Sequence, residues 1–216
     1  MVAANVDVVL LVVSTREGGR SHLIERLAAL GWDSGARPHF VITKIDLVGV
    51  SVLSEVEKSI VRNAPDVEWT AVDGPTGTRL EALRALLPFG QTAVMLGHSG
   101  VGKSTLLNRL LGTDKILTGT TRARDSKGRH TTTWRRLVAL PGNSCVFATP
   151  GVRGLGVQAK SSIERVFPER IEVAAHCRFA DCAHEGEPGC AVMQQIADGS
   201  VDIARFESFN HLQREA

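Results

Sequence analysis

Short apolar segments alternate with amphipathic stretches along the first two-thirds of the chain. The segment at 6–13 is too continuously apolar for a half-exposed strand, and it predicts a strand buried within a parallel sheet. From Ser21 the apolar residues recur at helical spacing, and Gly31 predicts the end of that helix. Further strands are predicted at 39–42, 67–72 and 92–96, and further helices at 51–62, 78–87 and 103–111. This alternation predicts an α/β fold, a mostly parallel sheet with helices on both faces.

The pattern changes after the helix that ends at residue 111. Residues 117–133 hold glycines, threonines and charges without periodicity and predict a long loop. Residues 134–140 and 144–147 predict a β-hairpin. Beyond it, short helical segments surround a group of cysteines. We therefore expect an α/β domain at 1–157 and a small, mainly helical domain at 158–216.

Composition narrows the class of protein. With 43% hydrophobic residues and a formal net charge of +2, the chain of 216 residues does not belong to the disordered class. No apolar segment is long enough to span a bilayer and no export signal is visible, so we expect a cytoplasmic protein without a membrane partner. Aromatic residues make up only 5%, which argues against a stacking platform for single-stranded nucleic acid.

The strongest motif is a phosphate-binding loop at 97–104, with the sequence G-H-S-G-V-G-K-S. It follows a predicted strand and opens a predicted helix, so backbone N–H groups and a helix N-terminus converge on phosphate oxygens. We expect Lys103 to reach the β/γ-phosphates and the Ser104 hydroxyl to bind Mg²⁺. The residues expected at the phosphates are Gly97, Ser99, Gly100, Val101, Gly102, Lys103, Ser104 and Thr105. The motif predicts binding of a nucleoside di- or triphosphate.

A candidate base-binding motif lies upstream, in Thr43-Lys44-Ile45-Asp46. The Asp46 carboxylate can accept hydrogen bonds from the ring N–H and the exocyclic amine of guanine, and the stem of Lys44 can lie along the ring. Thr70-Ala71, after another predicted strand, can offer a backbone N–H to the guanine carbonyl. Open α/β sheets bind ligands at the carboxyl ends of their strands, so these motifs and the phosphate loop predict one site for GTP or GDP.

Three cysteines and a histidine lie within fourteen residues, as Cys177-x4-Cys182-x-His184-x5-Cys190. Zn²⁺ prefers tetrahedral sulfur and nitrogen ligands, and a Cys₃His set leaves no open position for catalysis. We expect one structural zinc per chain that holds the small domain together. The alternative is a coincidental group of reduced cysteines.

The order of these motifs, base motif before phosphate loop, resembles that of a circularly permuted GTPase. Together with Gly128-Arg129-His130-Thr131-Thr132-Thr133, Thr149-Pro150-Gly151-Val152-Arg153 and the cysteine group, it resembles the RsgA (YjeQ) family over nearly the whole chain. The resemblance implies a circularly permuted P-loop GTPase domain and hydrolysis of GTP to GDP and phosphate with Mg²⁺. It also implies zinc on the same four ligands, and action on the small ribosomal subunit and its rRNA late in maturation.

The resemblance further assigns roles within the segments that follow the phosphate loop. His130 is implied as the residue that positions the attacking water, and Thr132 as a Mg²⁺ ligand beside Ser104. Gly151 is implied as a nucleotide contact. With Lys103, these residues form the expected catalytic set of His130, Lys103 and Thr132.

The sequence departs from the family pattern in three places. Family members usually carry an N-terminal OB-fold, whereas this sequence starts directly at its first strand, as a fragment or a natural short form would. Thr43 stands where Asn is usual, and Ala148 stands where the family has the Asp that organises the metal shell. We expect GTP hydrolysis that is slow and stimulated by the ribosome, and, as a separate expectation, a monomeric protein.

Two other functions stay open on the sequence alone. A nucleotide-sensing RNA-binding module with negligible hydrolysis suits Ala148, and also Val152, where many GTPases have Gln. A P-loop kinase would use the zinc domain as a platform for its acceptor substrate and would prefer adenine nucleotides. The six Lys and Arg residues at 122–136, against one Asp, suit either an RNA backbone or a solvated loop.

Overall fold

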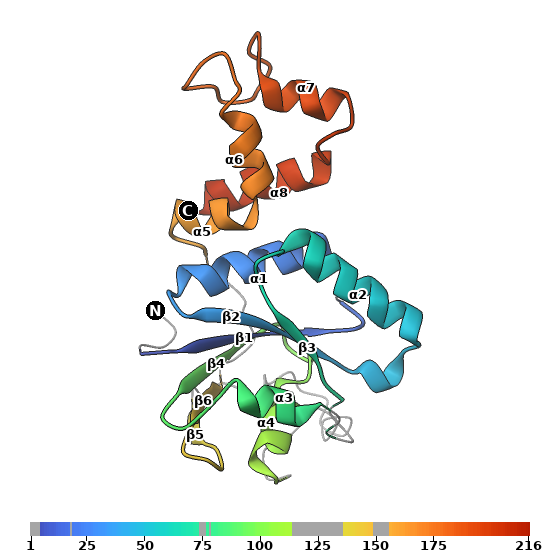
Figure 1. The fold of residues 1–216 in the computed structure, drawn as a ribbon, viewed down its shortest axis with the longest axis vertical. Helices are drawn as coiled ribbons and strands as arrows, with labels where there is room; N and C mark the ends of the chain where they lie inside the picture. The colour runs from blue at the N-terminus through green and yellow to red at the C-terminus, as the bar shows by residue number, and fades with distance from the viewer. Residues whose placement is uncertain (1–4, 18, 74–76, 78, 114–135, 149–155) are drawn as a thin grey trace, which may run out of the picture.

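The computed structural model describes residues 5–17, 19–73, 77, 79–113, 136–148 and 156–216. Within them a six-stranded sheet has the order β3-β2-β1-β4-β6-β5 (Figure 1). The strands are β1 (Val8–Ser14), β2 (Arg37–Thr43), β3 (Trp69–Ala71), β4 (Thr92–Leu96), β5 (Arg136–Ala139) and β6 (Cys145–Ala148). Neighbouring strands are parallel except β5 and β6, which form the predicted antiparallel hairpin. The predicted fold class is confirmed.

The central strand β1 explains why its sequence is continuously apolar. It pairs in parallel with β2 on one side and β4 on the other, so that Leu11 lies opposite Phe40 and Leu96. Every residue of β1 is buried. Alternate side chains therefore point into two separate apolar clusters, one on each face of the sheet.

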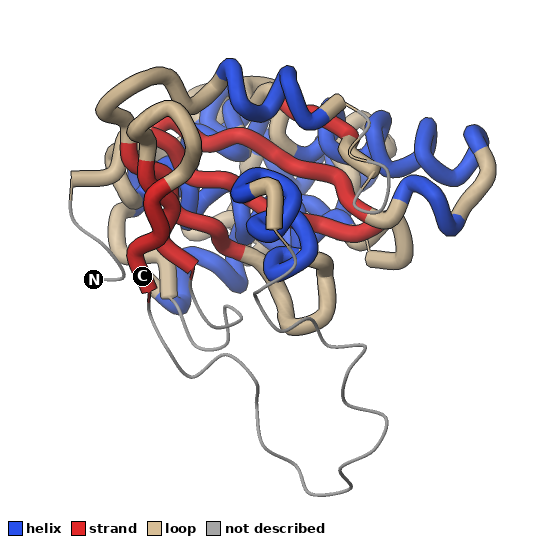
Figure 2. Tube along the Cα trace, turned by 90° about the horizontal axis from the view of Figure 1, so that it is seen from below, coloured by secondary structure: helices blue, strands red, loops and turns tan. Residues whose placement is uncertain are grey.

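Helices cover both faces of the sheet, as predicted (Figure 2). On one face, α1 (Ser21–Asp33) and α2 (Val50–Asn63) bury Ile24 and Ile60 in the same cluster as Leu11. On the other face, α3 (Leu80–Ala85) and α4 (Lys103–Leu111) bury Leu83 and Leu106 beside Leu10. This arrangement leaves the carboxyl ends of the parallel strands free to carry a site.

The end of α1 differs from the prediction, because the helix continues through Gly31 to Asp33. A Cβ at position 31 would lie 2.8 Å from the Cβ of Pro38, which shows that β2 passes too close for any side chain. Ser34 caps the end of the helix, and its hydroxyl donates to the carbonyl of Gly31 at 2.6 Å. The glycine is there for close packing and not as a helix stop.

Four helices form the C-terminal part of the described chain: α5 (Lys160–Val166), α6 (Pro168–Ala174), α7 (Ala191–Ala197) and α8 (Ile203–Glu215). Figure 1 shows α5 and α8 lying along α1, with α6 and α7 further from the sheet. Phe167 and Phe209 are fully buried here, with their rings edge-to-face at 5.4 Å. They belong to the same apolar cluster as α1, so the helical part shares a core with the sheet.

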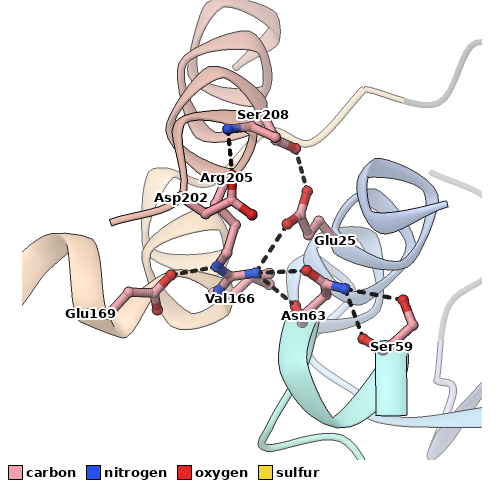
Figure 3. A network of polar contacts seen from close by, with 9 residues as sticks. Glu25, Ser59, Asn63, Val166, Glu169, Asp202, Arg205 and Ser208 are labelled. Carbon is pink, nitrogen blue, oxygen red and sulfur yellow. Dashed lines mark hydrogen bonds and ion pairs between the residues drawn. The ribbon is translucent and has the colours of Figure 1, made fainter. Parts of the chain in front are cut away.

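A partly buried polar network also joins α8 to α1 and α2 (Figure 3). The Arg205 guanidinium lies 3.0 Å from the carboxylate of Glu25 and donates to Asn63 Oδ1 at 3.3 Å and to Glu169 at 2.5 Å. Glu25 has no exposed surface and also accepts a hydrogen bond from Ser208. Burial raises the pKa of Glu25, while Ser208 and Arg205 lower it.

A membrane-spanning helix is absent from the described part of the chain, where every helix is too short or too polar for that purpose.

Candidate nucleotide site and metal centre

The phosphate loop connects β4 to α4 and lies directly on the ends of two other strands. Gly97 and Gly102 have φ angles of 154° and 108°, which favour glycine. A Cβ at Gly97 would collide with the carbonyl oxygen of Val12 in β1, and one at Gly102 would lie 3.3 Å from Thr43 Oγ1 at the end of β2. The glycines of the motif are therefore required by close packing as well as by backbone angle.

Lys103 begins α4, and its ammonium group is held over the loop. Its Nζ donates to the carbonyls of Gly97 and His98 at 2.6 and 2.7 Å. Burial lowers the pKa of Lys103 to about 8, and the charge of Glu17 opposes this by raising it. Ser104 and Thr105 follow, half-buried in the first turn of the helix. Backbone N–H groups and one cation thus gather at a helix N-terminus, as phosphate binding requires.

Thr43 connects the predicted base motif to the phosphate loop. Its side chain is buried, and its hydroxyl lies within hydrogen-bond distance of the carbonyls of Val13 (3.1 Å) and Val101. A hydroxyl has a single proton, so it donates to one of the two carbonyls at a time. Thr43, the first residue of the predicted base motif, therefore fixes the position of the two motifs relative to each other.

The rest of the base motif projects from the same edge of the sheet. Lys44 has a φ of 60° and leads into the 3₁₀ turn η1 (Ile45–Leu47), in which Asp46 is exposed. Thr15, at the end of β1, supports this turn: its hydroxyl donates to the carbonyl of Lys44 at 2.9 Å, and its N–H to that of Thr43 at 3.1 Å. The exposed carboxylate of Asp46 thus follows a backbone segment that Thr15 holds in place.

The second part of the predicted base site lies at the end of β3. Ala71 is buried and Thr70 is half-buried, with the hydroxyl of Thr70 2.9 Å from His39 Nε2. Burial lowers the pKa of His39 to about 4, so this ring is neutral at pH 7. Val72 N donates to the carbonyl of Ile42 at 2.8 Å, which keeps β3 against β2 beside the base motif.

Two residues of this edge were not predicted from the sequence, namely Thr15 and Glu17. Both follow β1, the strand between β2 and β4, so they lie between the base motif and the phosphate loop. One carboxylate oxygen of Glu17 is buried and has no hydrogen-bond partner among the described residues. The signal that could have identified them is their place just after the most apolar strand of a parallel sheet.

Several predicted site residues lie outside the described residues: His130, Thr132, Gly151 and the basic stretch as far as residue 135. Ala148 is described. It ends β6 opposite Met95 of β4, and its methyl group offers no ligand for a metal ion.

The four predicted zinc ligands come together in the helical part. Their ligand atoms all lie within 4.8 Å of one another. His184 Nδ1 is 3.5 Å from Cys177 Sγ and 3.4 Å from Cys190 Sγ. Tetrahedral zinc, with Zn–S of about 2.3 Å and Zn–N of about 2.05 Å, places sulfur and nitrogen ligands about 3.6 Å apart. Both the donor set and its spacing fit Zn²⁺.

Comparison with known proteins matches this chain to one family. The model of the RsgA GTPase family matches residues 1–158. The chain is 46% identical over 217 residues to the small ribosomal subunit biogenesis GTPase RsgA of Streptomyces coelicolor, covering 100% of this chain and 59% of that protein. It is 39% identical to RsgA 2 of Lactiplantibacillus plantarum, covering 100% of this chain and 60% of the relative. The chain thus spans about three-fifths of the length of these relatives.

Solved structures show the same architecture. YjeQ from Thermotoga maritima superposes with a TM-score of 0.67 at 26% identity, over 96% of this chain and 70% of that one. YloQ, which is described as a circularly permuted GTPase, shares the fold with a TM-score of 0.65 at 23% identity, over 97% of this chain and 68% of that one. The family model covers every nucleotide-site residue described above, and the curated relatives also cover the cysteine centre. The chain therefore belongs to the RsgA GTPase family.

Proposed function

We propose that this chain binds GTP and GDP at the carboxyl edge of the sheet, hydrolyses GTP slowly, and acts on the small ribosomal subunit. The observation that carries the proposal is the direct link, through Thr43, between the phosphate loop and a Lys44–Asp46 motif with guanine-binding chemistry. Supporting it, the family match covers this whole site. We include in the proposal a boundary between residues 157 and 158, close to the end of the family match.

The loop residues would bind the phosphates by charge and by oriented N–H groups. Phosphoryl transfer depends mainly on positioning and electrostatic stabilisation, and the Lys103 ammonium and the N-terminus of α4 supply both. Ser104 offers the hydroxyl that would hold Mg²⁺, which, when bound, neutralises phosphate charge. We propose that His130 orients the attacking water and that Thr132 completes the metal shell with Ser104. Gly151 is proposed as a further nucleotide contact.

Base selection is proposed to rest on Asp46. Its carboxylate accepts hydrogen bonds, which matches the N–H and amine groups on one edge of guanine and is a mismatch for adenine. We expect calorimetry to show GDP binding at least about 100-fold more tightly than ADP. Asp46→Asn replaces one acceptor oxygen with a donor, so the variant should favour xanthosine diphosphate, whose ring carries a carbonyl in place of the amine. Equal affinity for GDP and ADP would contradict the proposal and favour a kinase.

The position of Ala148 supports one alternative, a nucleotide sensor with negligible hydrolysis. Single-turnover GTP hydrolysis with and without small ribosomal subunits separates the two functions. We expect phosphate release above background, faster when the subunits are present. No release in either condition, with GTP still bound, would favour the sensor.

The partner is proposed from the names of the relatives, which are called small ribosomal subunit biogenesis GTPases. We propose that the chain, as a cytoplasmic monomer, binds the small subunit and its rRNA late in maturation. Cosedimentation should recover it with small subunits when a non-hydrolysable GTP analogue is present, and in smaller amount with GDP. Equal recovery in both states, or none, would contradict nucleotide-controlled binding.

A further inference from the structure

The loop that carries His184 has an unusual backbone for a metal ligand. Among the four ligands, His184 alone has a left-handed conformation, with a φ of 61°, which residues other than glycine rarely adopt. Within the described part of the chain, residues 183–186 take part in no backbone-to-backbone hydrogen bond. The conformation that presents the imidazole to the three cysteines must therefore be held by contacts with side chains.

The carboxylate of Glu187 supplies these contacts. Its Oε1 accepts a hydrogen bond from the N–H of Ala183 at 2.7 Å, and its Oε2 accepts one from the N–H of Glu185 at 2.8 Å. The two donors flank His184 in the chain, so one half-buried carboxylate bonds the backbone on both sides of this ligand. Hydrogen bonds to an ionised acceptor are roughly twice as strong as those between neutral groups.

The main chain of Glu187 helps to place a second ligand. Its carbonyl accepts from the N–H of Cys190 at 3.1 Å and closes a turn over Glu187-Pro188-Gly189-Cys190. Proline at the second position and a glycine with a φ of 82° at the third are typical of a type II turn. Glu187 therefore joins the backbone around His184 to that of Cys190, whose Sγ lies 3.4 Å from His184 Nδ1.

We propose that Glu187 is a positioning residue of the metal centre: its carboxylate holds His184 beside Cys177 and Cys190, so that the ligands are arranged before the metal binds and zinc affinity increases. The inference goes beyond the proposed function and rests on a metal ion binding to the four ligands. Two competing explanations assign less to this side chain. In one, Glu187 contributes only negative charge, and in the other it stabilises the loop without acting through His184.

The first substitutions, made in the full chain, separate position from charge. Zinc affinity is measured by competition with a chromophoric chelator. Outer-shell groups of metal sites typically change affinity by about 10–100-fold, so we expect a loss of that size for Glu187→Ala. Glu185→Ala is the matched control, because it removes an exposed carboxylate from the same loop, and it should stay within about threefold of the unchanged chain. Equal losses in the two variants, or a loss below about threefold in Glu187→Ala, would overturn the proposal.

A double-mutant cycle tests whether Glu187 acts through His184. The His184→Ala protein keeps three thiolate ligands and should bind zinc more weakly than the unchanged chain. Adding Glu187→Ala to it should change zinc affinity by less than about threefold, because the ligand that the carboxylate positions is already gone. A carboxylate that only stabilises the loop would cost as much in this background as in the unchanged chain, and that result would overturn the proposal.

Two further measurements decide if one of these variants fails. Glu187→Gln keeps the side-chain length and one acceptor oxygen, so it can keep one of the two hydrogen bonds, and we expect a loss of about tenfold. If Glu187→Ala does not fold, Glu187→Gln decides, and a loss below about threefold overturns the proposal.

If His184→Ala binds no metal, the ligand-field absorption of Co²⁺ bound to Glu187→Ala decides. At saturation this variant should show the bands of the unchanged chain, because the same four ligands bind, although more Co²⁺ is needed to reach them. Different bands would overturn the proposal. Failure of the unchanged chain to bind zinc would overturn both the proposal and the assignment of the metal.

Discussion

Replacing Arg205 with methionine tests whether the helical part and the sheet form one cooperative unit. The substitution removes the partner of Glu25, which has no exposed surface, and leaves that carboxylate with only the hydrogen bond from Ser208. It also removes donors to Asn63 Oδ1 and, at 2.8 Å, to the carbonyl of Val166. Helices α1, α2, α5 and α6 therefore each lose a contact with α8, including the one between Arg205 and Glu169 (Figure 3).

The magnitude follows from the two ways in which Glu25 can respond. An unpaired buried charge left by breaking an ion pair costs about 3–5 kcal/mol. The alternative is to take up a proton, which at pH 7 costs about 1.4 kcal/mol for each unit between pH 7 and the ordinary pKa of Glu, or about 3.7 kcal/mol in total. Because Glu25 can take up a proton, the electrostatic contribution to the loss of stability cannot exceed the cost of protonation. The lost hydrogen bonds add about 1 kcal/mol each. We expect the free energy of unfolding to fall by about 3–5 kcal/mol at pH 7.

Urea denaturation at several pH values provides the assay. A carboxyl whose pKa is raised in the folded state favours the protonated folded protein, so its destabilising effect is largest above the folded-state pKa and shrinks as pH falls towards the unfolded value. The difference in free energy of unfolding between the Arg205→Met protein and the unchanged chain should therefore become smaller as the pH falls from 7 to 5. The double variant Glu25→Met/Arg205→Met removes both charges and should recover most of the loss.

Arg26 offers a matched control on the same pair of helices. Its guanidinium lies 2.6 Å from Glu215 of α8, but the two side chains are 29% and 26% exposed, so Arg26→Met should cost about 0–1 kcal/mol. The reasoning would be refuted if Arg205→Met lowered the free energy of unfolding by less than about 1 kcal/mol. It would also be refuted if the double variant were no more stable than Arg205→Met.

Three further predictions concern the sheet and its site. Gly31→Ala should destabilise the protein by about 1–3 kcal/mol despite the better helix propensity of alanine, because its Cβ would meet that of Pro38 at 2.8 Å; an unchanged urea midpoint would contradict this packing. Affinity for GDP should fall about tenfold between pH 7 and pH 9, because Lys103 has a pKa of about 8 and loses its charge as pH rises. In Glu17→Gln, which lacks the charge that raises this pKa, the fall should begin at lower pH, whereas identical profiles would exclude Glu17. Ala148→Asp should increase Mg²⁺-dependent single-turnover hydrolysis, and an unchanged rate would show that a carboxylate at position 148 does not limit the proposed hydrolysis.

The sequence by itself determined those features that depend on local spacing. The apolar stretch of β1, the G-x-x-x-x-G-K-S loop and the Cys₃His group each have a physical requirement that neighbouring residues satisfy, namely burial on both faces, glycine angles and short ligand spacing. The predicted strand–helix order, the parallel sheet and the gathering of Cys177, Cys182, His184 and Cys190 were confirmed for this reason.

Only the tertiary structure decided the contacts between distant residues. The local sequence predicts that Gly31 ends a helix, whereas the structure shows that Pro38 packs against it and leaves no room for a side chain. The role of Thr43 depends on its contact with Val101, which lies 58 residues further along the chain. Arg205 and Glu25 are 180 residues apart, and nothing in the local pattern of either predicts the pair. Periodicity and spacing describe what a segment buries, whereas the choice of partner depends on which segments the sheet order and helix packing bring together.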